Sequence, residues 1–159
     1  MLETFIINFK QKSMKRKFFL FSFFLLAISY SSLLAQEGKK VVDTKKHKVV
    51  MQVTVGDESM QNSIIRQVKN VKAALPNAEI EVVCHSGGLA MLVDEKCVVK
   101  DEIKELSGQM VTFAACENTM RREKVEKKDL VSQAISVPSG MAELIIKQDA
   151  GWAYVKAGH

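Results

Sequence analysis

Two hydrophobic periodicities alternate along residues 48–155 of the chain. Short runs rich in β-branched residues, closed by turn residues, predict strands, and apolar residues three and four positions apart predict helices. The predicted strands are residues 48–55, 79–85, 110–116, 134–137 and 152–155, and the predicted helical segments are 59–75, 89–93, 100–106, a helix capped by Asn118 or Thr119 that ends near Lys124, 127–131 and 141–148.

The order of these elements indicates the class of fold. Strands and helices alternate without a hairpin dipeptide, which favours right-handed βαβ units on a mainly parallel sheet of about five strands. The carboxyl ends of parallel strands meet at one edge, where the binding sites of open α/β sheets form. The segments expected at that edge are residues 56–58, 84–88, 116–119 and 138–140.

Cys116 has the most suggestive position at this edge, within the stretch FAACENTMRR. It ends a predicted buried strand and precedes a helix, whose unpaired N–H groups favour a thiolate. Arg121 and Arg122 are close enough in sequence to lower the pKa of the thiol, whereas the adjacent Glu117 opposes a second negative charge. The alternative is that Cys116 only completes the strand's core, because free cysteine is often fully buried.

Other polar residues at the same edge are candidates for binding or proton transfer. His85 is a candidate acid, base or hydrogen-bond donor if its ring faces Cys116, and otherwise a loop histidine without a role. The loops HSGG and PSG lack the spacing of a phosphate-binding fingerprint. The candidate ligand-binding residues are Asn118, Thr119, Arg121, Arg122, Ser139 and Gly140.

The remaining cysteines and histidines do not predict a metal site or a cofactor. The three cysteines Cys84, Cys97 and Cys116 form no C-x-x-C pair, and the histidines are scattered. Cys84 is expected in the core and Cys97 in a charged loop. In an oxidising compartment, an odd number of cysteines leaves at least one thiol free, paired between chains or modified.

The amino-terminal region predicts export. Lys15–Lys17 precedes an almost unbroken apolar run from Phe18 to Ala35, which is typical of a signal peptide that begins near Met14 and is cut after Ala35. An uncleaved membrane anchor is the alternative. We therefore expect an exported, periplasmic protein with a leader at residues 1–35, a polar linker at 36–47 and one domain at 48–159.

The net charge of +5 changes little in this picture. Five of the 23 basic residues and one of the 18 acidic residues lie in residues 1–35, which leaves 18 basic and 17 acidic residues in the remainder. A nearly neutral domain gives no reason to expect a nucleic acid as partner.

Three stretches resemble one protein family. FAACENTMRR, AISVPSGMAELIIKQDAGWAYVK and EVVCHSGGLAML are similar to segments of DsrE/DsrF-like (YchN-type) proteins, and the resemblance spans residues 47–157. It implies a flavodoxin-like three-layer α/β/α fold and homo-oligomers, often trimers or hexamers. It also implies that Cys116 accepts sulfane sulfur as a persulfide and passes it to a thiol or sulfur-carrier protein. Glu117 stands where many relatives have glycine.

Two functions are consistent with the sequence. The first is sulfur handling by Cys116, with His85 and nearby cationic groups assisting. The second is a non-catalytic oligomeric module that binds a small anionic ligand or a protein at the same edge. The missing C-x-x-C disfavours a disulfide oxidoreductase. Whether the protein turns over a substrate is left open.

Overall fold

The computed structural model describes residues 42–158, so the predicted leader and the first half of the predicted linker, residues 36–41, lie outside the described residues. No helix within residues 42–158 combines the length and the apolarity that a membrane span needs. The strands are β1 (Lys48–Val53), β2 (Glu79–Cys84), β3 (Val111–Cys116), β4 (Ala134–Val137) and β5 (Ala153–Lys156), the α-helices are α2 (Glu58–Ala74), α3 (Lys100–Ser107), α4 (Glu117–Glu123) and α5 (Gly140–Asp149), and the 3₁₀ helices are η2 (Ser86–Leu92), η3 (Asp94–Lys96) and η4 (Lys127–Asp129).

The five strands form one sheet in the order β4-β3-β2-β1-β5, and every neighbouring pair is parallel. Five of the six residues are buried in each of β2 and β3, as expected for strands covered on both faces. The predicted flavodoxin-like, three-layer α/β/α architecture is therefore confirmed.

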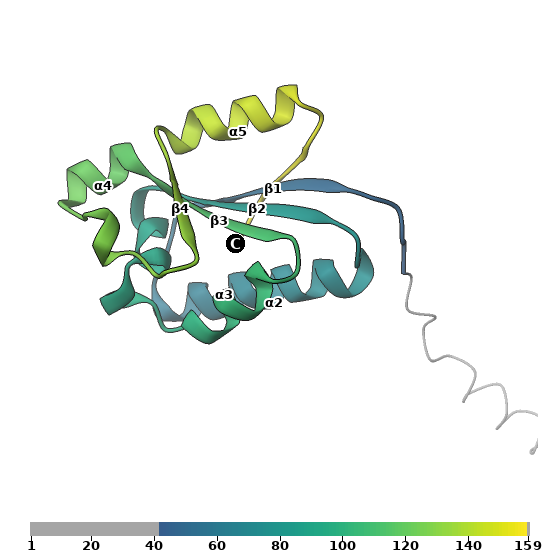
Figure 1. Ribbon diagram of the computed structural model, residues 1–159, viewed down its shortest axis with the longest axis horizontal. Coiled ribbons are helices and arrows are strands. Elements are labelled where there is room, and N and C mark those ends of the chain that lie inside the picture. Colours follow the sequence, from purple (N-terminus) through teal and green to yellow (C-terminus); the bar gives the residue numbers. More distant parts are fainter. Residues whose placement is uncertain (1–41, 159) are drawn as a thin grey trace, which may run out of the picture. The chain divides into compact units, whose positions relative to one another are not determined.

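Helices cover the two faces of the sheet unequally. Figure 1 shows α5 on one side of the sheet and α2 and α3 on the other. The larger apolar core lies on the α2 side and contains Phe113, Ile64 and Ile103, while the smaller core on the α5 side is built around Val83 and Leu144. This asymmetry follows from the strand order. The chain moves in one direction from β1 to β4 and then returns past β1 to β5, so the right-handed last crossover lies on the opposite face.

The strand order also fixes where a site can form. β3 leads into α4, whose Met120 belongs to the α2-side core, whereas the neighbouring β4 leads into α5 on the other face. The two connections diverge from adjacent strand ends, and such a divergence is the usual ligand position in open α/β sheets. Cys116 ends β3 beside this divergence and pairs with Val137 of β4.

Two local predictions need correction. Neither Asn118 nor Thr119 caps the helix after β3, because α4 begins at Glu117 and Cys116 occupies the N-cap position. The Thr119 hydroxyl instead accepts the Ser86 N–H at 3.1 Å, so it serves the neighbouring loop. The helix predicted at 89–93 is the 3₁₀ helix η2, which starts earlier and packs tightly on β1. A Cβ on Gly88 would lie 2.3 Å from the Val53 carbonyl oxygen.

Candidate functional site

The sulfur of Cys116 lies among hydrogen-bond donors. The Gly140 backbone N–H donates to Sγ at 3.1 Å, and the Thr119 hydroxyl and the backbone N–H groups of Thr119 and Asn118 also interact with it. Burial opposes ionisation, since only 4% of Cys116 is exposed. The hydrogen bonds outweigh this effect and hold the pKa of Cys116 below the usual thiol value.

Gly140 is the residue that lets α5 approach the sulfur. The Ser139 hydroxyl caps α5 by accepting the Ala142 N–H, so the helix axis is fixed at its first turn. A Cβ on Gly140 would lie 3.2 Å from the His85 Cβ and 3.3 Å from the Cys116 Cβ. A side chain at this position would therefore press on both residues, and glycine allows the N–H to reach Sγ.

His85 and Cys116 both lie close to Gly140, but the ring nitrogens of His85 bond to other residues. Its Nε2 lies 2.8 Å from Gln52 Nε2, and its Nδ1 lies 3.1 Å from Ser86 Oγ. The Tyr154 hydroxyl donates to Gln52 Oε1, which orients the amide so that its NH₂ donates to His85. We assign the proton of the neutral ring to Nδ1 from this network.

His85 is held neutral by its surroundings, and its hydrogen bonds continue toward the thiol. Burial lowers the pKa of His85, and the positive charge of Arg122 lowers it further. Ser86 adopts a left-handed φ of 51°, a conformation that costs a non-glycine residue about 1–3 kcal/mol, and its N–H then meets the Thr119 hydroxyl. A chain of hydrogen bonds therefore runs from Tyr154 on β5 to Thr119 beside Cys116.

Glu117 follows Cys116 directly in sequence, but its carboxylate is bonded to other side chains. Its Oε1 accepts from the Ser136 hydroxyl at 2.7 Å and lies 3.1 Å from Lys127 Nζ. The bond from Ser136, the interactions with Lys127 and the charge of Arg121 keep the pKa of Glu117 below its usual value. The carboxylate is therefore ionised at neutral pH, with its charge partly balanced by lysine.

Not all of the predicted site residues meet at the sulfur. The guanidinium of Arg121 donates to Asn118 Oδ1, and Arg122 Nε lies 2.9 Å from Glu123 Oε1. Both arginines thus pair within α4. The sulfur is surrounded by the backbone of Asn118, Thr119 and Gly140. The ring nitrogens of His85 bond elsewhere, and Ser139 acts as a cap.

Gln52 and Tyr154 were not predicted at this edge, and Ser86 was predicted there only as part of the segment 84–88, without a role. Gln52 and Tyr154 are 102 residues apart, and only the pairing of β1 with β5 places them side by side. Gln52 did carry a signal, because it is the one polar residue among the apolar residues that follow Lys48 in β1.

The other two thiols differ from Cys116. Burial, with a smaller contribution from the nearby Cys97, raises the pKa of Cys84 far above the usual range. Burial also raises the pKa of Cys97. All three cysteines are free in the structure, and Cys116 is the one whose pKa is lowered. Within residues 42–158, no cluster of three or more candidate ligands could hold a metal ion.

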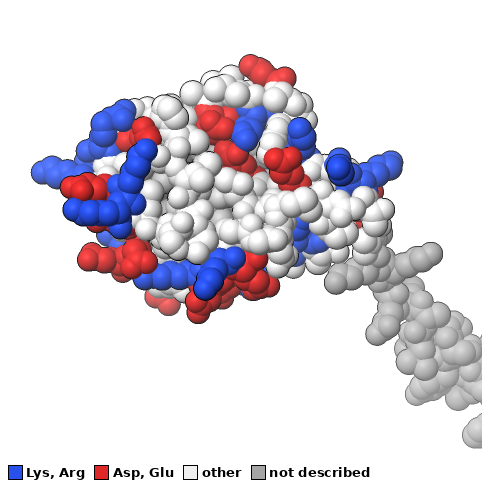
Figure 2. Space-filling view, viewed as in Figure 1, with Lys and Arg blue, Asp and Glu red and all other residues white. Residues whose placement is uncertain are grey.

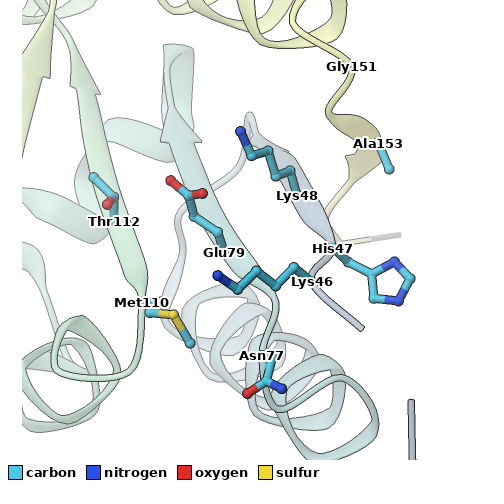
Figure 3. A pocket seen from close by; sticks show the side chains of 9 residues that line it. All are labelled: Lys46, His47, Lys48, Asn77, Glu79, Met110, Thr112, Gly151 and Ala153. Carbon is cyan, nitrogen blue, oxygen red and sulfur yellow. The ribbon is translucent and has the colours of Figure 1, made fainter. Parts of the chain in front are cut away.

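The largest described cavity lies at the other end of the sheet. Its volume is about 710 Å³, and it opens at the amino ends of the strands, between Lys48, Glu79 and Thr112 (Figure 3). Among the cavities found within residues 42–158, none of the three that we describe is lined by Cys116. Only 4% of Cys116 is exposed, so little of the residue is accessible to solvent.

Comparisons with known proteins agree with this architecture. A five-stranded, all-parallel sheet with helices on both faces defines a small α/β protein of the flavodoxin-like type. The sequence profile of the DsrE/DsrF-like family matches residues 47–157, and the chain belongs to this family.

The chain is also similar to a solved structure, that of a protein of unknown function from Methanobacterium thermoautotrophicum. The two sequences are 34% identical, the match covers 69% of this chain and 98% of the other, and the TM-score is 0.66. A search of curated proteins found no match.

Proposed function

We propose that the protein is a sulfur carrier that holds sulfane sulfur on Cys116 as a persulfide. The observation that supports this most is the convergence of N–H and O–H donors on one sulfur atom, led by the Gly140 N–H at 3.1 Å. Such donors stabilise a thiolate, which is the nucleophilic form of cysteine. Membership in the DsrE/DsrF-like family adds support, because the sulfur-relay role is one that the family resemblance implies.

The transfer needs no external oxidant or reductant. The Cys116 thiolate attacks the outer sulfur of a sulfane donor R–S–S⁻, a new S–S bond forms to Cys116, and R–S⁻ leaves. The product is Cys116–S–S⁻. An acceptor thiolate then attacks the outer sulfur, takes it as a new persulfide and returns Cys116 to its thiolate. His85, neutral and bonded through both nitrogens, orders the surroundings in this scheme.

The burial of Cys116 narrows the class of donor. With 4% of the residue exposed, a small inorganic polysulfide reaches the sulfur more easily than a thiol on a folded protein surface. The acceptor is a thiol compound or a sulfur-carrier protein that engages the same edge of the sheet.

Intact mass spectrometry after incubation with polysulfide tests the proposal. The native protein should gain the mass of one sulfur atom, reversibly with a thiol reductant. The Cys116→Ser variant should gain none, whereas Cys84→Ser, which removes a buried thiol of raised pKa, should behave like the native protein. Equal uptake by the native protein and Cys116→Ser would refute the role of Cys116.

A second candidate is a non-catalytic module that binds a small anion or a protein partner at this edge. The near-complete burial of Cys116 is the observation that favours it. Alkylation of the native protein distinguishes the two candidates. A Cys116 that resists a small alkylating reagent at every pH, and reacts only after unfolding, would support the second function.

We also propose that the protein is exported and forms a homo-oligomer, a trimer or a hexamer. β5 supports the assembly, because it is an edge strand on which all four residues are exposed, including Tyr154 and Val155. Light scattering of the purified protein gives the oligomer mass, and a monomer would contradict the proposal. Amino-terminal sequencing of the mature protein should begin at Gln36.

A further inference from the structure

Helix α5 faces the sheet with an unusual set of side chains. Gly140, Glu143, Leu144 and Lys147 follow helical spacing and form its least exposed stripe, so two of the four inward positions carry charge. The apolar residues Met141, Ile145 and Ile146 instead point outward and are more than half exposed. A helix that packs on a sheet normally has the opposite pattern.

The charged side chains of this stripe meet a buried carboxylate on the sheet. Glu81 lies in the middle of β2, is 4% exposed, and places Oε2 2.5 Å from Lys147 Nζ. Glu143 Oε1 lies 3.6 Å from the same nitrogen. Lys147 Nζ also lies 4.3 Å from the centroid of the Trp152 ring, which is within the range of a cation–π interaction. Figure 2 shows acidic and basic side chains side by side where α5 lies.

Apolar packing contributes little to holding α5 in place. Leu144 is the one α5 side chain in the small core on this face, which otherwise consists of short sheet residues and the partly buried Trp152. The Oε1 atom of Glu81 is buried and has no hydrogen-bond partner. A well-packed apolar pair of similar size is often at least as stable as a buried ion pair. The charged cluster therefore calls for an explanation other than stability.

We propose that Glu81, Glu143 and Lys147 are positioning residues that clamp α5 on the sheet and so hold its first N–H, that of Gly140, against the sulfur of Cys116. We call these three residues the ionic clamp. On α5, Glu143 lies about one turn and Lys147 about two turns after Gly140. The bonds of the clamp are directional, whereas the contact of a single leucine allows α5 to slide. The inference rests on the proposed role of Cys116 as the reacting thiol.

The test is the pH profile of Cys116 alkylation, followed by mass spectrometry of the peptide that contains it. In Lys147→Met, α5 loses its central cation, and the midpoint of the profile should move to higher pH. At pH 7 the alkylation rate, divided by the plateau rate of the same variant at high pH, should fall about three- to tenfold, because the thiolate fraction falls tenfold for each unit by which the pKa rises. Lys69→Met removes a lysine from an exposed ion pair with Glu105 and should leave the profile unchanged.

A role in stability alone gives a different result. If Lys147→Met lowers the melting temperature but keeps the native midpoint, the clamp does not position the thiol and the proposal is overturned. Should Lys147→Met fail to fold, Glu81→Gln decides, since it keeps the shape and an acceptor for Lys147. We expect a midpoint at higher pH in that variant as well, and an unchanged midpoint overturns the proposal.

Two readouts separate this inference from the proposed function. Trp152 is the only tryptophan of the chain, so its fluorescence reports directly on the clamp in the variants. Alkylation measures the thiolate whether or not sulfur is carried. Native protein that takes up no sulfane sulfur would therefore end the sulfur-carrier proposal, while the shift between native and clamp variants would still decide the positioning role.

Discussion

Gly140 is where the backbone of α5 comes nearest to the thiol, and Gly140→Ala adds a methyl group there without changing any charge. The new Cβ would lie 3.2 Å from the His85 Cβ and 3.3 Å from both the Cys116 Cβ and Val83 Cγ1. These contacts are a few tenths of an ångström tighter than ordinary packing. The first turn of α5 must move outward, and the bond from the Gly140 N–H to Sγ, now 3.1 Å, must lengthen.

Two energies follow from this displacement. Adding a methyl group to a packed position costs about 1–3 kcal/mol of stability. A hydrogen bond to a charged group contributes about 1.5–3 kcal/mol, so weakening it by half removes about 1 kcal/mol from the thiolate. An energy of that size lowers the thiolate population about fivefold at a pH below the pKa.

The pH profile of Cys116 alkylation measures this effect. We expect Gly140→Ala to react about fivefold more slowly at neutral pH, with its midpoint at higher pH and its plateau little changed. Gly108→Ala is the matched control, since its Cβ would meet only the Glu105 carbonyl oxygen at 3.5 Å. A Gly140→Ala protein that folds and keeps the native midpoint would show that the Gly140 N–H does not stabilise the thiolate.

The pH dependence of stability, a buried lysine and the network around His85 each carry a further prediction. The lowered pKa of Cys116 means that, just below the ordinary thiol value of 9.0, the unfolded chain binds more protons than the folded one. The free energy of unfolding of the native protein, relative to that of Cys116→Ser, should therefore rise with pH in this window, and this gain should be lost at lower pH. Urea unfolding under reducing conditions measures the difference. A difference that does not change with pH would contradict the lowered pKa. Lys72→Met should lower the free energy of unfolding in the same assay by about 1–3 kcal/mol, because Nζ donates to the carbonyls of Pro76 and Ala78 at 2.7 and 2.8 Å. A change near zero would be inconsistent with these hydrogen bonds. Nitrogen NMR should find the neutral His85 ring protonated at Nδ1, and a proton on Nε2 would disprove the assigned network.

The sequence predicted where the site lies in the fold better than it predicted which side chains surround the sulfur. Alternating periodicities were sufficient for a parallel sheet, and a parallel sheet necessarily brings Cys116 and Gly140 to the same edge. Arg121 and Arg122 follow Cys116 closely in sequence, which suggested that their charges act on the thiol. Helical geometry instead places their guanidinium groups beside other residues of α4.

Contacts that depend on strand order could not be predicted. Gln52 and Tyr154 become neighbours because the chain returns past β1 to form β5, and no local pattern shows that return. The same holds for the ionic clamp, since Glu81 alternates with apolar residues as a solvent-facing residue of β2 would. Only the packing of α5 on that face turns the position into a buried one.

The role of Cys116 is tested most sharply by locating the sulfur that the protein takes up. The native protein is treated with polysulfide, trapped with a small alkylating reagent, digested and analysed by mass spectrometry. We expect a trapped persulfide on the peptide that contains Cys116, and unmodified thiols at Cys84 and Cys97. An unmodified Cys116, or sulfur distributed equally over the three cysteines, would contradict this role.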